Sequence, residues 1–475
     1  MTQPFPNNPL LKNNFAPLLV ECDAPDLVIE GEIPAALRGT LYRNGPNPMF
    51  PPLGRNHHWF LGEGMIHALH VEDGKVSYRN RWVRTDQYVK QRTAGRRLVD
   101  TSFGGPRAPG GEDVKNNVAN TNIVFHAGKL LALDEGSSPV AMDAEKLDTA
   151  GSWDFAGGYT GPMTAHPKFD PKTGEMCFFG YMAAGPASPD IAYNVVDASG
   201  RLVRADMFKA PYASMVHDFI VTDEHVIFPI FPATIDVERI MKGGPVIAWD
   251  PSVSTMIGIM GRNDPVSSIR WFEGEPCYVY HPMNAFTVRE NGRVKVVADM
   301  MKYSRVPLFP DVDGQKAPAD LSAEQGKLVR WTFDLDDNSN GYTEEQLTDL
   351  GGEFPRFDER FAGAAYRHGF YAAQTLPLAE GAPFDTIVHI DLQTGKRREY
   401  VPGTGCFVHE PVFVPRTPTS PEGDGYVVSL VYDSATNLSD FIVLDADDIS
   451  KGPIGRAKLP VRVPFGFHGN WRDLR

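Results

Sequence analysis

The sequence has few cysteines, no excess of positive charge and no long apolar run, and each absence excludes a class of protein. Its 475 residues include four cysteines, Cys22, Cys177, Cys277 and Cys406, with no CxxC spacing. Thiols this far apart fit a reducing compartment, in which they act as small hydrophobic groups. The net charge of −14 has the wrong sign for a protein that follows phosphate backbones. We therefore expect no nucleic acid partner.

Membrane-spanning and secretory signals are also missing. No apolar run approaches the length that crosses a bilayer, and residues 1–26 have no basic start, apolar stretch or small-residue cleavage site. We therefore expect a cytoplasmic protein. The hydrophobic content of 42% and aromatic content of 11% are enough for a large core.

Short β-type runs around tight turns make up most of the chain. Examples are "MIHALHVEDGKVSYRNRWV", "TNIVFHAGKLLALDEG", "AHPKFDPKTGEMCFFGYM", "AYNVVDASGRLVRADMF", "NAFTVRENGRVKVVADM" and "TIVHIDLQTGKRREYVP". In each, two runs flank a DG, AG, TG, SG or NG pair, which predicts a hairpin. Helical periodicity is scarce, and we expect at most a turn or two of helix in "PADLSAEQGKLV" and "TEEQLTDLGG".

Hairpins spread from about residue 30 to 465 without a linker favour one closed all-β domain over the whole chain, 1–475. A β-propeller hides its sheet edges by radial repetition and accommodates this length. The internal repeat is weak, however, so the pattern alone leaves a pair of β-sandwiches open. The Pro-rich stretch 302–320 is typical of a long loop over one face.

Four of the thirteen histidines share one local frame. Each follows β-type or small residues and precedes a residue that bends or ends a strand, in "TAHPKF", "SMVHDF", "VYHPMNAF" and "FGFHGNW". These histidines are His166, His217, His281 and His468. Imidazoles at the inner ends of different blades could converge and bind a borderline metal such as iron, copper or zinc. Four unrelated core histidines are the alternative.

Metal-bound imidazoles usually donate their second N–H to a carboxylate or carbonyl, so acids in apolar company are candidate partners. Three glutamates qualify: Glu135 in "LLALDEGSSPV", Glu353 in "GGEFPRFD" and Glu410 in "HEPVFVPR". A solvated turn position is the alternative for each of them.

An ordered series of short motifs resembles the carotenoid cleavage oxygenase family, which includes the bacterial stilbene- and phenylpropene-cleaving oxygenases. The motifs run from about residue 28 to 472 and are "LYRNGPNP", "HHWFLGEGMIHALH", "AHPKFDPKTGEMCFFGY", "MVHDF", "YHPMNAF", "EFPRFD", "EPVFVPR", "EGDGYVVSLVYD" and "LPVRVPFGFHGNW".

The resemblance implies a seven-bladed β-propeller, with loops and short helices capping one face over an axial iron site. It implies one Fe(2+) per chain, which is held by His166, His217, His281 and His468. It implies no organic cofactor. Glu135, Glu353 and Glu410 would then orient histidines. The implied activity is cleavage of a conjugated C=C bond by O₂ to two carbonyl products, with no catalytic side chain beyond the metal centre.

The substrate stays open between an apocarotenoid or carotenoid and an aromatic alkene such as a stilbene, isoeugenol or a vinylphenol. We expect Trp59, Phe60, Asp134 and Phe286 to line its path. As the resemblance has it, stilbene-cleaving bacterial members carry a lysine just before the glutamate of "LALDEG", where it can bind the phenol oxygen of the substrate. This chain has Asp134 at that position, and an anion there would repel a phenolate. A carotenoid substrate would predict peripheral membrane contact.

Two other functions remain open from the sequence. The same fold and metal site could serve an iron-dependent isomerase or hydrolase that does not consume O₂. A non-enzymatic propeller used as a binding scaffold is the other alternative, with the four histidines as core residues. The sequence does not indicate the oligomeric state.

Overall fold

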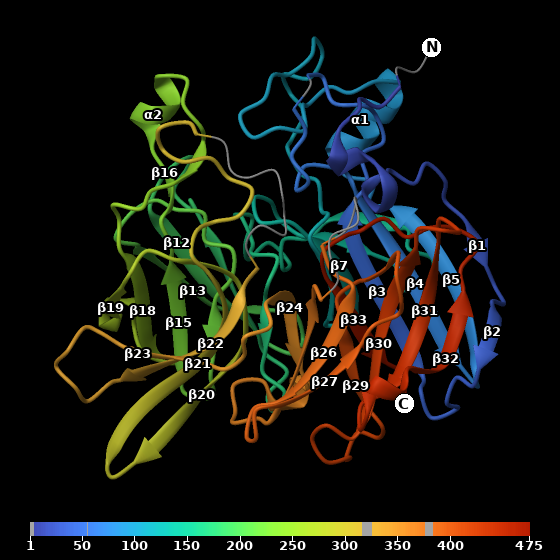
Figure 1. Ribbon diagram of the computed structural model, residues 1–475. Coiled ribbons are helices and arrows are strands. Elements are labelled where there is room, and N and C mark those ends of the chain that lie inside the picture. The colour runs from blue at the N-terminus through green and yellow to red at the C-terminus, as the bar shows by residue number, and fades with distance from the viewer. Residues whose placement is uncertain (1–3, 55, 316–324, 376–382) are drawn as a thin grey trace. The chain divides into compact units, whose positions relative to one another are not determined.

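Two compact units make up the part of the chain that the computed structural model describes, residues 4–54, 56–315, 325–375 and 383–475. Unit 1 comprises Met1–Gly157, Phe370–His389 and Arg397–Arg475, and unit 2 comprises Gly158–Gly369 and Ile390–Lys396. Strands dominate both units (Figure 1). The all-β class is therefore confirmed, while a single domain over the whole chain stays a prediction.

Seven sheets of four to six strands are the blades of a seven-bladed β-propeller, as the resemblance implied. Unit 1 contains the sheets β1-β5-β4-β3-β33, β6-β7-β8-β9 and β2-β32-β31-β30-β28, with β29 also paired to β30. Their strands are β1 (Asp23–Ala24), β2 (Val28–Gly31), β3 (Gly39–Pro46), β4 (Gly64–Glu72), β5 (Lys75–Trp82), β6 (Asn122–His126), β7 (Lys129–Leu133), β8 (Val140–Met142), β9 (Thr149–Ser152), β28 (Cys406–Val408), β29 (Val412–Pro415), β30 (Gly425–Asp433), β31 (Leu438–Asp445), β32 (Pro453–Lys458) and β33 (Gly469–Asp473).

Unit 2 contains the sheets β10-β11-β12-β13, β14-β15-β18-β19 and β20-β21-β22-β23, and the small pair β16-β17. Their strands are β10 (Lys168–Phe169), β11 (Met176–Tyr181), β12 (Asp190–Val196), β13 (Leu202–Lys209), β14 (Ile220–Val221), β15 (His225–Ile230), β16 (Ala233–Ile235), β17 (Ile247–Trp249), β18 (Thr255–Gly261), β19 (Arg270–Gly274), β20 (Tyr278–Glu290), β21 (Arg293–Tyr303), β22 (Lys327–Asp334) and β23 (Thr343–Gln346). The remaining sheet has the order β24-β25-β26-β27, with strands Gly352–Phe357, His368–Ala373, Thr386–Asp391 and Lys396–Tyr400.

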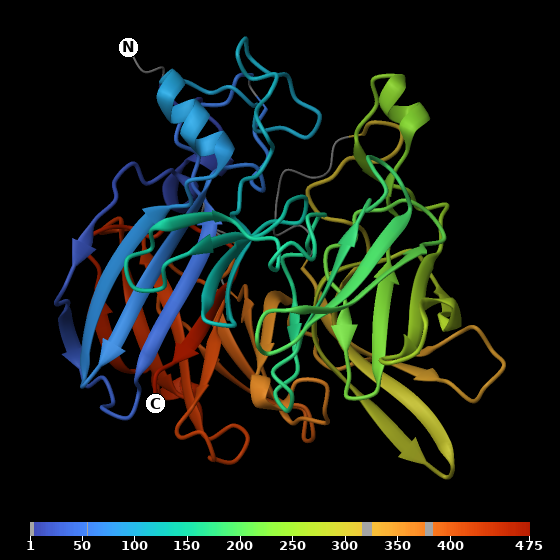
Figure 2. The ribbon, with the colours of Figure 1, turned by 180° about the vertical axis from the view of Figure 1, so that it is seen from behind.

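The predicted hairpins are confirmed at their turns. β20 and β21 pair through Asn291 and Gly292, whose φ values of 52° and 81° suit a tight turn between twisted strands. Asp73 and Gly74 join β4 to β5 in the same way, with φ values of 50° and 74°. The β20–β21 hairpin, in yellow, extends well beyond its sheet (Figure 2).

Strands from both ends of the chain pair with one another in unit 1. The C-terminal strand β33 pairs with β3, with Gly469 opposite Arg43, and the N-terminal strand β2 pairs with β32, with Val28 opposite Lys458. Because each sheet uses a strand from the opposite end of the chain, the last residues are held within an ordered sheet, where chain ends usually fray.

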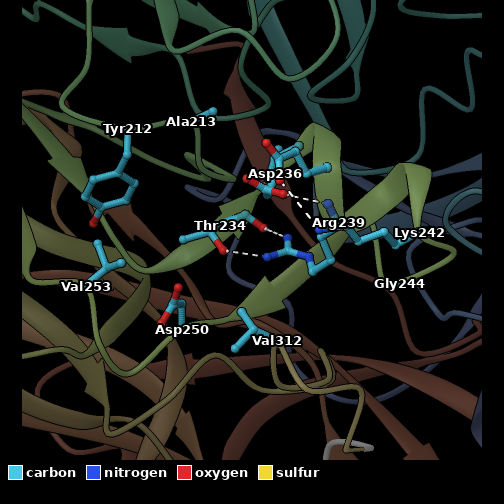
Figure 3. Close-up of a pocket in the computed structure, with 12 residues that line it drawn as sticks. Tyr212, Ala213, Thr234, Asp236, Arg239, Lys242, Gly244, Asp250, Val253 and Val312 are labelled. Atoms are coloured by element: carbon cyan, nitrogen blue, oxygen red, sulfur yellow. Dashed lines mark hydrogen bonds and ion pairs between the residues drawn. The ribbon is translucent and has the colours of Figure 1, made fainter.

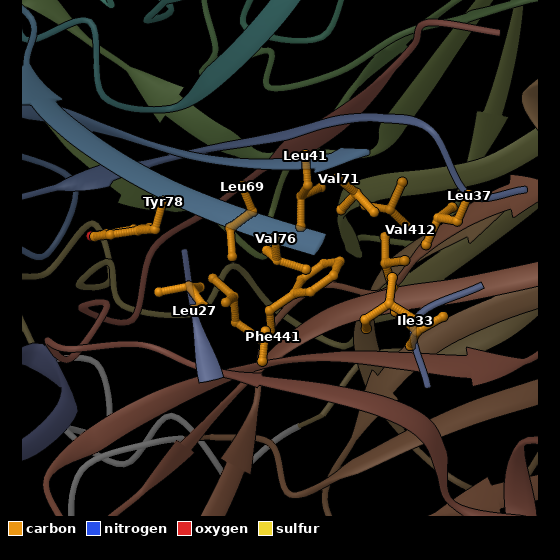
Figure 4. Close-up of a cluster of buried hydrophobic side chains, with 14 of the residues drawn as sticks. Leu27, Ile33, Leu37, Leu41, Leu69, Val71, Val76, Tyr78, Val412 and Phe441 are labelled. Atoms are coloured by element: carbon orange, nitrogen blue, oxygen red, sulfur yellow. The ribbon is translucent and has the colours of Figure 1, made fainter. Parts of the chain in front are cut away.

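A hydrophobic core packs these two sheets against each other. Leu41, Leu69 and Val76 project from β3, β4 and β5 toward Phe441 of β31 and Val412 of β29 (Figure 4). All five side chains are buried. Burial of this apolar surface fixes β3, and β3 in turn carries β33 and the segment before it.

The helices differ from the prediction. The predicted helical turn in "TEEQLTDLGG" is wrong, because Thr343–Gln346 forms the edge strand β23 on β22. The other predicted turn, "PADLSAEQGKLV", lies mostly outside the described residues. The structure instead has two α-helices in its described part, α1 (Asp86–Ala94) and α2 (Val237–Met241), and short 3₁₀ turns at Pro9–Leu11, Asn13–Phe15, Val266–Ser268, Glu359–Phe361 and Ile449–Lys451.

Among the described residues, no helix is both long and apolar enough to cross a membrane. The four cysteines are free thiols, as predicted, and Cys177 and Cys277 are buried. Burial raises the pKa of the Cys277 thiol to about 11, so it stays protonated and unreactive at neutral pH.

Candidate metal centre

Three of the four predicted histidines meet in unit 2. His166 lies just before β10, His217 just before β14, and His281 within β20. The Nε2 atom of His217 lies 3.1 Å from Nε2 of His166 and 3.0 Å from Nε2 of His281. All three side chains are buried. Residues far apart in the sequence thus present one nitrogen each to a common point.

The spacing of these nitrogens fits one bound metal ion. For metal–nitrogen bonds of about 2.1 Å, ligands at right angles lie about 3.0 Å apart and tetrahedral ligands about 3.4 Å apart. The observed 3.0 and 3.1 Å match the right-angled arrangement, which leaves room for further ligands on the same ion. Neutral imidazoles suit a borderline metal such as iron better than Mg²⁺ or Ca²⁺, which prefer oxygen.

Glu353, one of the predicted histidine partners, lies against His281. Nδ1 of His281 lies 2.6 Å from Oε2 of Glu353, and both residues are buried. Burial, together with the charge of Glu353, raises the pKa of the buried Tyr303 well above its usual value. Since His281 donates from Nδ1 to the carboxylate, its Nε2 lone pair faces the other two histidines.

Phe354, the residue after Glu353, has an unusual backbone. Its φ of 57° is left-handed, which is rare for a bulky residue. Its N–H donates to Oε2 of Glu353 at 2.5 Å, and its ring stacks on His281 with centroids 5.7 Å apart. The strained conformation therefore holds both the carboxylate and the imidazole in place.

Two further charged residues lie behind His166. Oδ2 of Asp218 is 3.7 Å from Nδ1 of His166, and Oδ1 of Asp218 is 2.7 Å from Nζ of Lys168. Burial raises the pKa of Asp218, and the nearby Lys168 ammonium opposes that effect. The sequence reasoning missed Asp218, Lys168 and Tyr303, although Asp218 directly follows a predicted ligand.

His468 belongs to unit 1, where a second glutamate holds it. Its Nδ1 lies 2.8 Å from Oε1 of Glu410, and Oε2 of Glu410 accepts the Gly469 N–H at 2.7 Å. The backbone is also fixed, because Asn44 donates to the His468 carbonyl at 2.9 Å and His468 donates to the Thr121 carbonyl at 3.1 Å. His468 is thus buried and oriented, like His281.

A close backbone approach lets the His468 segment lie against β3. A Cβ added to Gly466 would lie 2.7 Å from the Asn44 carbonyl oxygen and 2.9 Å from Cα of Gly45. Only glycine fits there, which accounts for the glycines in both "RNGPNP" and "PFGFHG".

The residues of the "LALDEG" segment lie just after β7. Glu135 is half-buried, and its predicted role in orienting a histidine stays a prediction. The Asp134 carboxylate accepts from the backbone N–H groups of Val118, Ala119 and Gly136 and from the Ser137 hydroxyl. These bonds make Asp134 a loop-capping residue, and they commit its carboxylate to the chain rather than to a substrate.

Trp59 and Phe60 lie in an aromatic cluster in unit 1. Trp59 is buried against Phe467, with centroids 4.5 Å apart, and Phe60 packs edge-on to Phe467 at 5.4 Å. His58 contacts both Phe60 and the partly exposed Phe103. Because Phe467 directly precedes His468, these rings lie beside a predicted ligand.

Phe286 lies elsewhere. It is five residues after His281 on β20, which corresponds to roughly 16 Å along a regular strand. Its ring contacts Tyr366 and the Arg330 guanidinium. Phe286 therefore lies apart from the histidines, and its predicted role in lining the substrate path stays a prediction.

A cavity of about 670 Å³ in unit 2 is a separate feature (Figure 3). No histidine lines it. Arg239 faces Thr234 and donates to its hydroxyl at 3.0 Å and its carbonyl at 2.5 Å, while Tyr212 donates to the Ile230 carbonyl at 2.9 Å. The Arg239 and Tyr212 groups are thus bonded to the chain itself.

The chain is similar to known proteins over nearly its whole length. The family model described as retinal pigment epithelial membrane protein matches residues 15–473. Lignostilbene-α,β-dioxygenase isozyme III of Sphingomonas paucimobilis is 38% identical over 99% of this chain and 98% of its own length. Isoeugenol monooxygenase of Pseudomonas nitroreducens is 37% identical over 98% of each chain. The crystal structure of Pseudomonas brassicacearum lignostilbene dioxygenase has a TM-score of 0.92 and 37% identity, and covers 99% of this chain and all of that one (100%).

Proposed function

This chain belongs to the carotenoid cleavage oxygenase family, and we propose that it cleaves the side-chain double bond of an aromatic alkene, a stilbene or a phenylpropene. Oxidative cleavage of a C=C bond with O₂ at an Fe(II) centre is the chemistry of the family, and the chain is an iron-dependent oxygenase of that class. The observation that carries the proposal is the set of buried histidine nitrogens 3.0 and 3.1 Å apart.

We propose His166, His217, His281 and His468 as the iron ligands. These are the four histidines of one candidate metal-binding group. Carboxylates stand behind His281 and His468, with Nδ1–O distances of 2.6 and 2.8 Å. Each carboxylate accepts the Nδ1 proton and so leaves Nε2 as the donor to a metal.

Fe(II), held by these histidines, would supply the redox-active cation for the reaction of the alkene with O₂. The protein's own part is to hold the imidazoles neutral and correctly turned, to exclude water and to place the alkene. Glu353 and Glu410 fix the tautomers of His281 and His468. Buried surroundings around each ring keep water away from the reacting atoms.

The aromatic cluster of His58, Trp59, Phe60, Phe103 and Phe467 supports an aromatic substrate. Flat rings beside His468 give an arene stacking and edge contacts. Burial and the neighbouring His57 lower the pKa of His58 to about 3, so this wall stays uncharged at neutral pH. The two relatives named for lignostilbene and isoeugenol favour the same substrate class.

Recognition of a phenol through the "LALDEG" segment is not part of the proposal. Asp134 has its carboxylate bonded to backbone N–H groups, and it offers no cation to a phenolate. A substrate of this size is delivered from water, so the proposal does not require the membrane contact that a carotenoid would.

Product analysis tests the substrate class. We expect mass spectrometry to find aromatic aldehydes when the iron-loaded enzyme is given a hydroxystilbene, isoeugenol or a vinylphenol under ¹⁸O₂, with label in at least one product. An apocarotenal in the same panel should react slowly or not at all, because it has no arene to stack on the aromatic cluster. Cleavage of the apocarotenal alone would overturn the substrate proposal. Products without label, after correction for exchange with water, would favour an isomerase or hydrolase.

Glu353→Gln should weaken iron binding by about 10- to 100-fold, the usual effect of losing a carboxylate behind a ligand histidine. The amide cannot offer His281 the same charged acceptor at 2.6 Å. Competition with a coloured chelator measures the iron dissociation constant directly.

Glu63→Gln is the matched control for this variant. Glu63 is also buried and ion-paired, to Arg97 at 2.6 Å, but its bonds go to residues outside the histidine group. Iron affinity should survive that change. Equal weakening in both variants would mean that lost stability, rather than His281, explains the result.

A further inference from the structure

Asp218 lies on the Nδ1 side of His166 at 3.7 Å, farther than the 2.6 and 2.8 Å at which glutamates approach His281 and His468. Two successive residues approach opposite edges of the His166 ring. His217 reaches Nε2 from the front at 3.1 Å, and Asp218 faces Nδ1 from behind with Oδ2 at 3.7 Å. A ring held between these two contacts has its Nε2 turned toward the histidine group.

The two oxygens of Asp218 have different partners. Oδ1 accepts from the Lys168 ammonium at 2.7 Å and from the Phe219 N–H at 2.7 Å. Oδ2 faces His166. Because Lys168 and the backbone fix Oδ1, the carboxylate cannot rotate freely, and Oδ2 is held on the Nδ1 side of the ring.

The negative charge of Asp218 would stabilise a metal-bound His166 ring. Asp218 is 5% exposed, and an ionised carboxylate at such a site needs a nearby cation, which Lys168 supplies. When an imidazole binds a metal cation through Nε2, its Nδ1–H becomes more positive, so a carboxylate 3.7 Å away stabilises the metal-bound ring more than the free one.

We infer that Asp218 is a positioning residue for His166, and that Lys168 holds the Asp218 carboxylate in its orientation. The motifs "HPK" and "HD" then form one unit, in which His166 contacts His217 and Lys168 contacts Asp218. This inference rests on the proposed role of His166 as an iron ligand.

Asp218→Asn is the main test. The amide keeps the size of the side chain and an oxygen for the Phe219 N–H but removes the charge. We expect iron affinity, measured by chelator competition, to fall by about 10-fold or more. This is the lower end of the loss in metal affinity seen when a carboxylate behind a ligand histidine is removed. The visible spectrum of the Co(II)-loaded protein should also change, because the ring that carries the ligand nitrogen is less firmly held.

Asp299→Asn is the matched control. Asp299 in unit 2 is also buried and ion-paired, to Arg330 at 2.8 Å, and it accepts from Tyr366 rather than from a histidine. Its variant should keep the iron affinity and the Co(II) spectrum. An unchanged affinity in Asp218→Asn, or an equal loss in Asp299→Asn, would overturn the inference.

Lys168 provides a second test. Lys168→Met should weaken iron binding, and adding it to Asp218→Asn should cause little further loss, because both act through one contact. Lys168→Arg should restore most of the affinity. Fully additive losses would contradict the linked role of the two residues.

His166→Ala, measured beside these variants, separates this inference from the ligand assignment. If His166→Ala keeps its iron, the proposed ligand set fails. If His166→Ala loses iron while Asp218→Asn does not, the ligand set stands and only the role of Asp218 fails.

Discussion

His217→Ala should lose both iron and activity. Its Nε2 lies 3.1 Å from Nε2 of His166 and 3.0 Å from Nε2 of His281. The substitution removes a ligand atom itself. The loss of iron affinity should therefore exceed the loss of about 100-fold that follows removal of a residue behind a ligand. Iron analysis of the purified protein and the rate of aldehyde formation are the two measurements.

His225→Ala is the control for that experiment. His225 lies on β15 in the same unit and is half-buried, and its Nδ1 bonds Thr287 at 3.0 Å. It should keep its iron and its activity. Iron-free but fully active His217→Ala protein would contradict the metal mechanism, and loss of iron from His225→Ala would show that the unit itself had unfolded.

The candidate ligands were visible in the sequence because each occupies a distinctive local frame. In the sequence, a β-type or small residue before each histidine and a proline, aspartate or glycine after it mark all four. The structure brings His166, His217 and His281 together, although His281 lies within β20 and not at a strand end. Glu353 and Glu410 were also recognisable, since an acid in an apolar strand needs a buried partner.

The residues that hold the ligands and their glutamates in place could not be recognised in the sequence, because their roles depend on contacts between distant parts of the chain. Tyr303 reaches Glu353 from another strand, and Lys168 reaches Asp218 across 50 positions of sequence. The left-handed φ of Phe354 has no sequence signal, since glycine or asparagine is the usual sign of that conformation.

The helices show a similar limit. α1 was missed although Thr85 caps its start and Gly95, with φ of 65°, ends it. Its buried face carries Gln87 and Gln91, which bond Glu63, so the helix has no apolar stripe to detect. Thr343–Gln346 had helical propensity, yet the open edge of β22 and the Trp331 indole bond to Glu344 made it a strand.

Deletion of the last ten residues, 466–475, should remove the iron site together with the closing strand. It takes away His468 and all of β33, which leaves the β3 edge and its N–H and C=O groups without their partner strand. Bound iron should fall from about one per chain to near zero, since a metal site lacking a ligand loses most of its affinity. The melting temperature should drop sharply as well.

Deletion of 472–475 alone should leave the iron bound. His468 and its contact to Glu410 remain, and Gly469 still pairs with Arg43. The protein should nevertheless be less stable, because Arg472 and Asp473 pair with β3 and the Arg472 guanidinium lies over the Phe125 ring at 4.1 Å. Iron analysis and thermal melting of both truncations therefore separate the ligand from the strand. Iron retained after the ten-residue deletion would remove His468 from the ligand set.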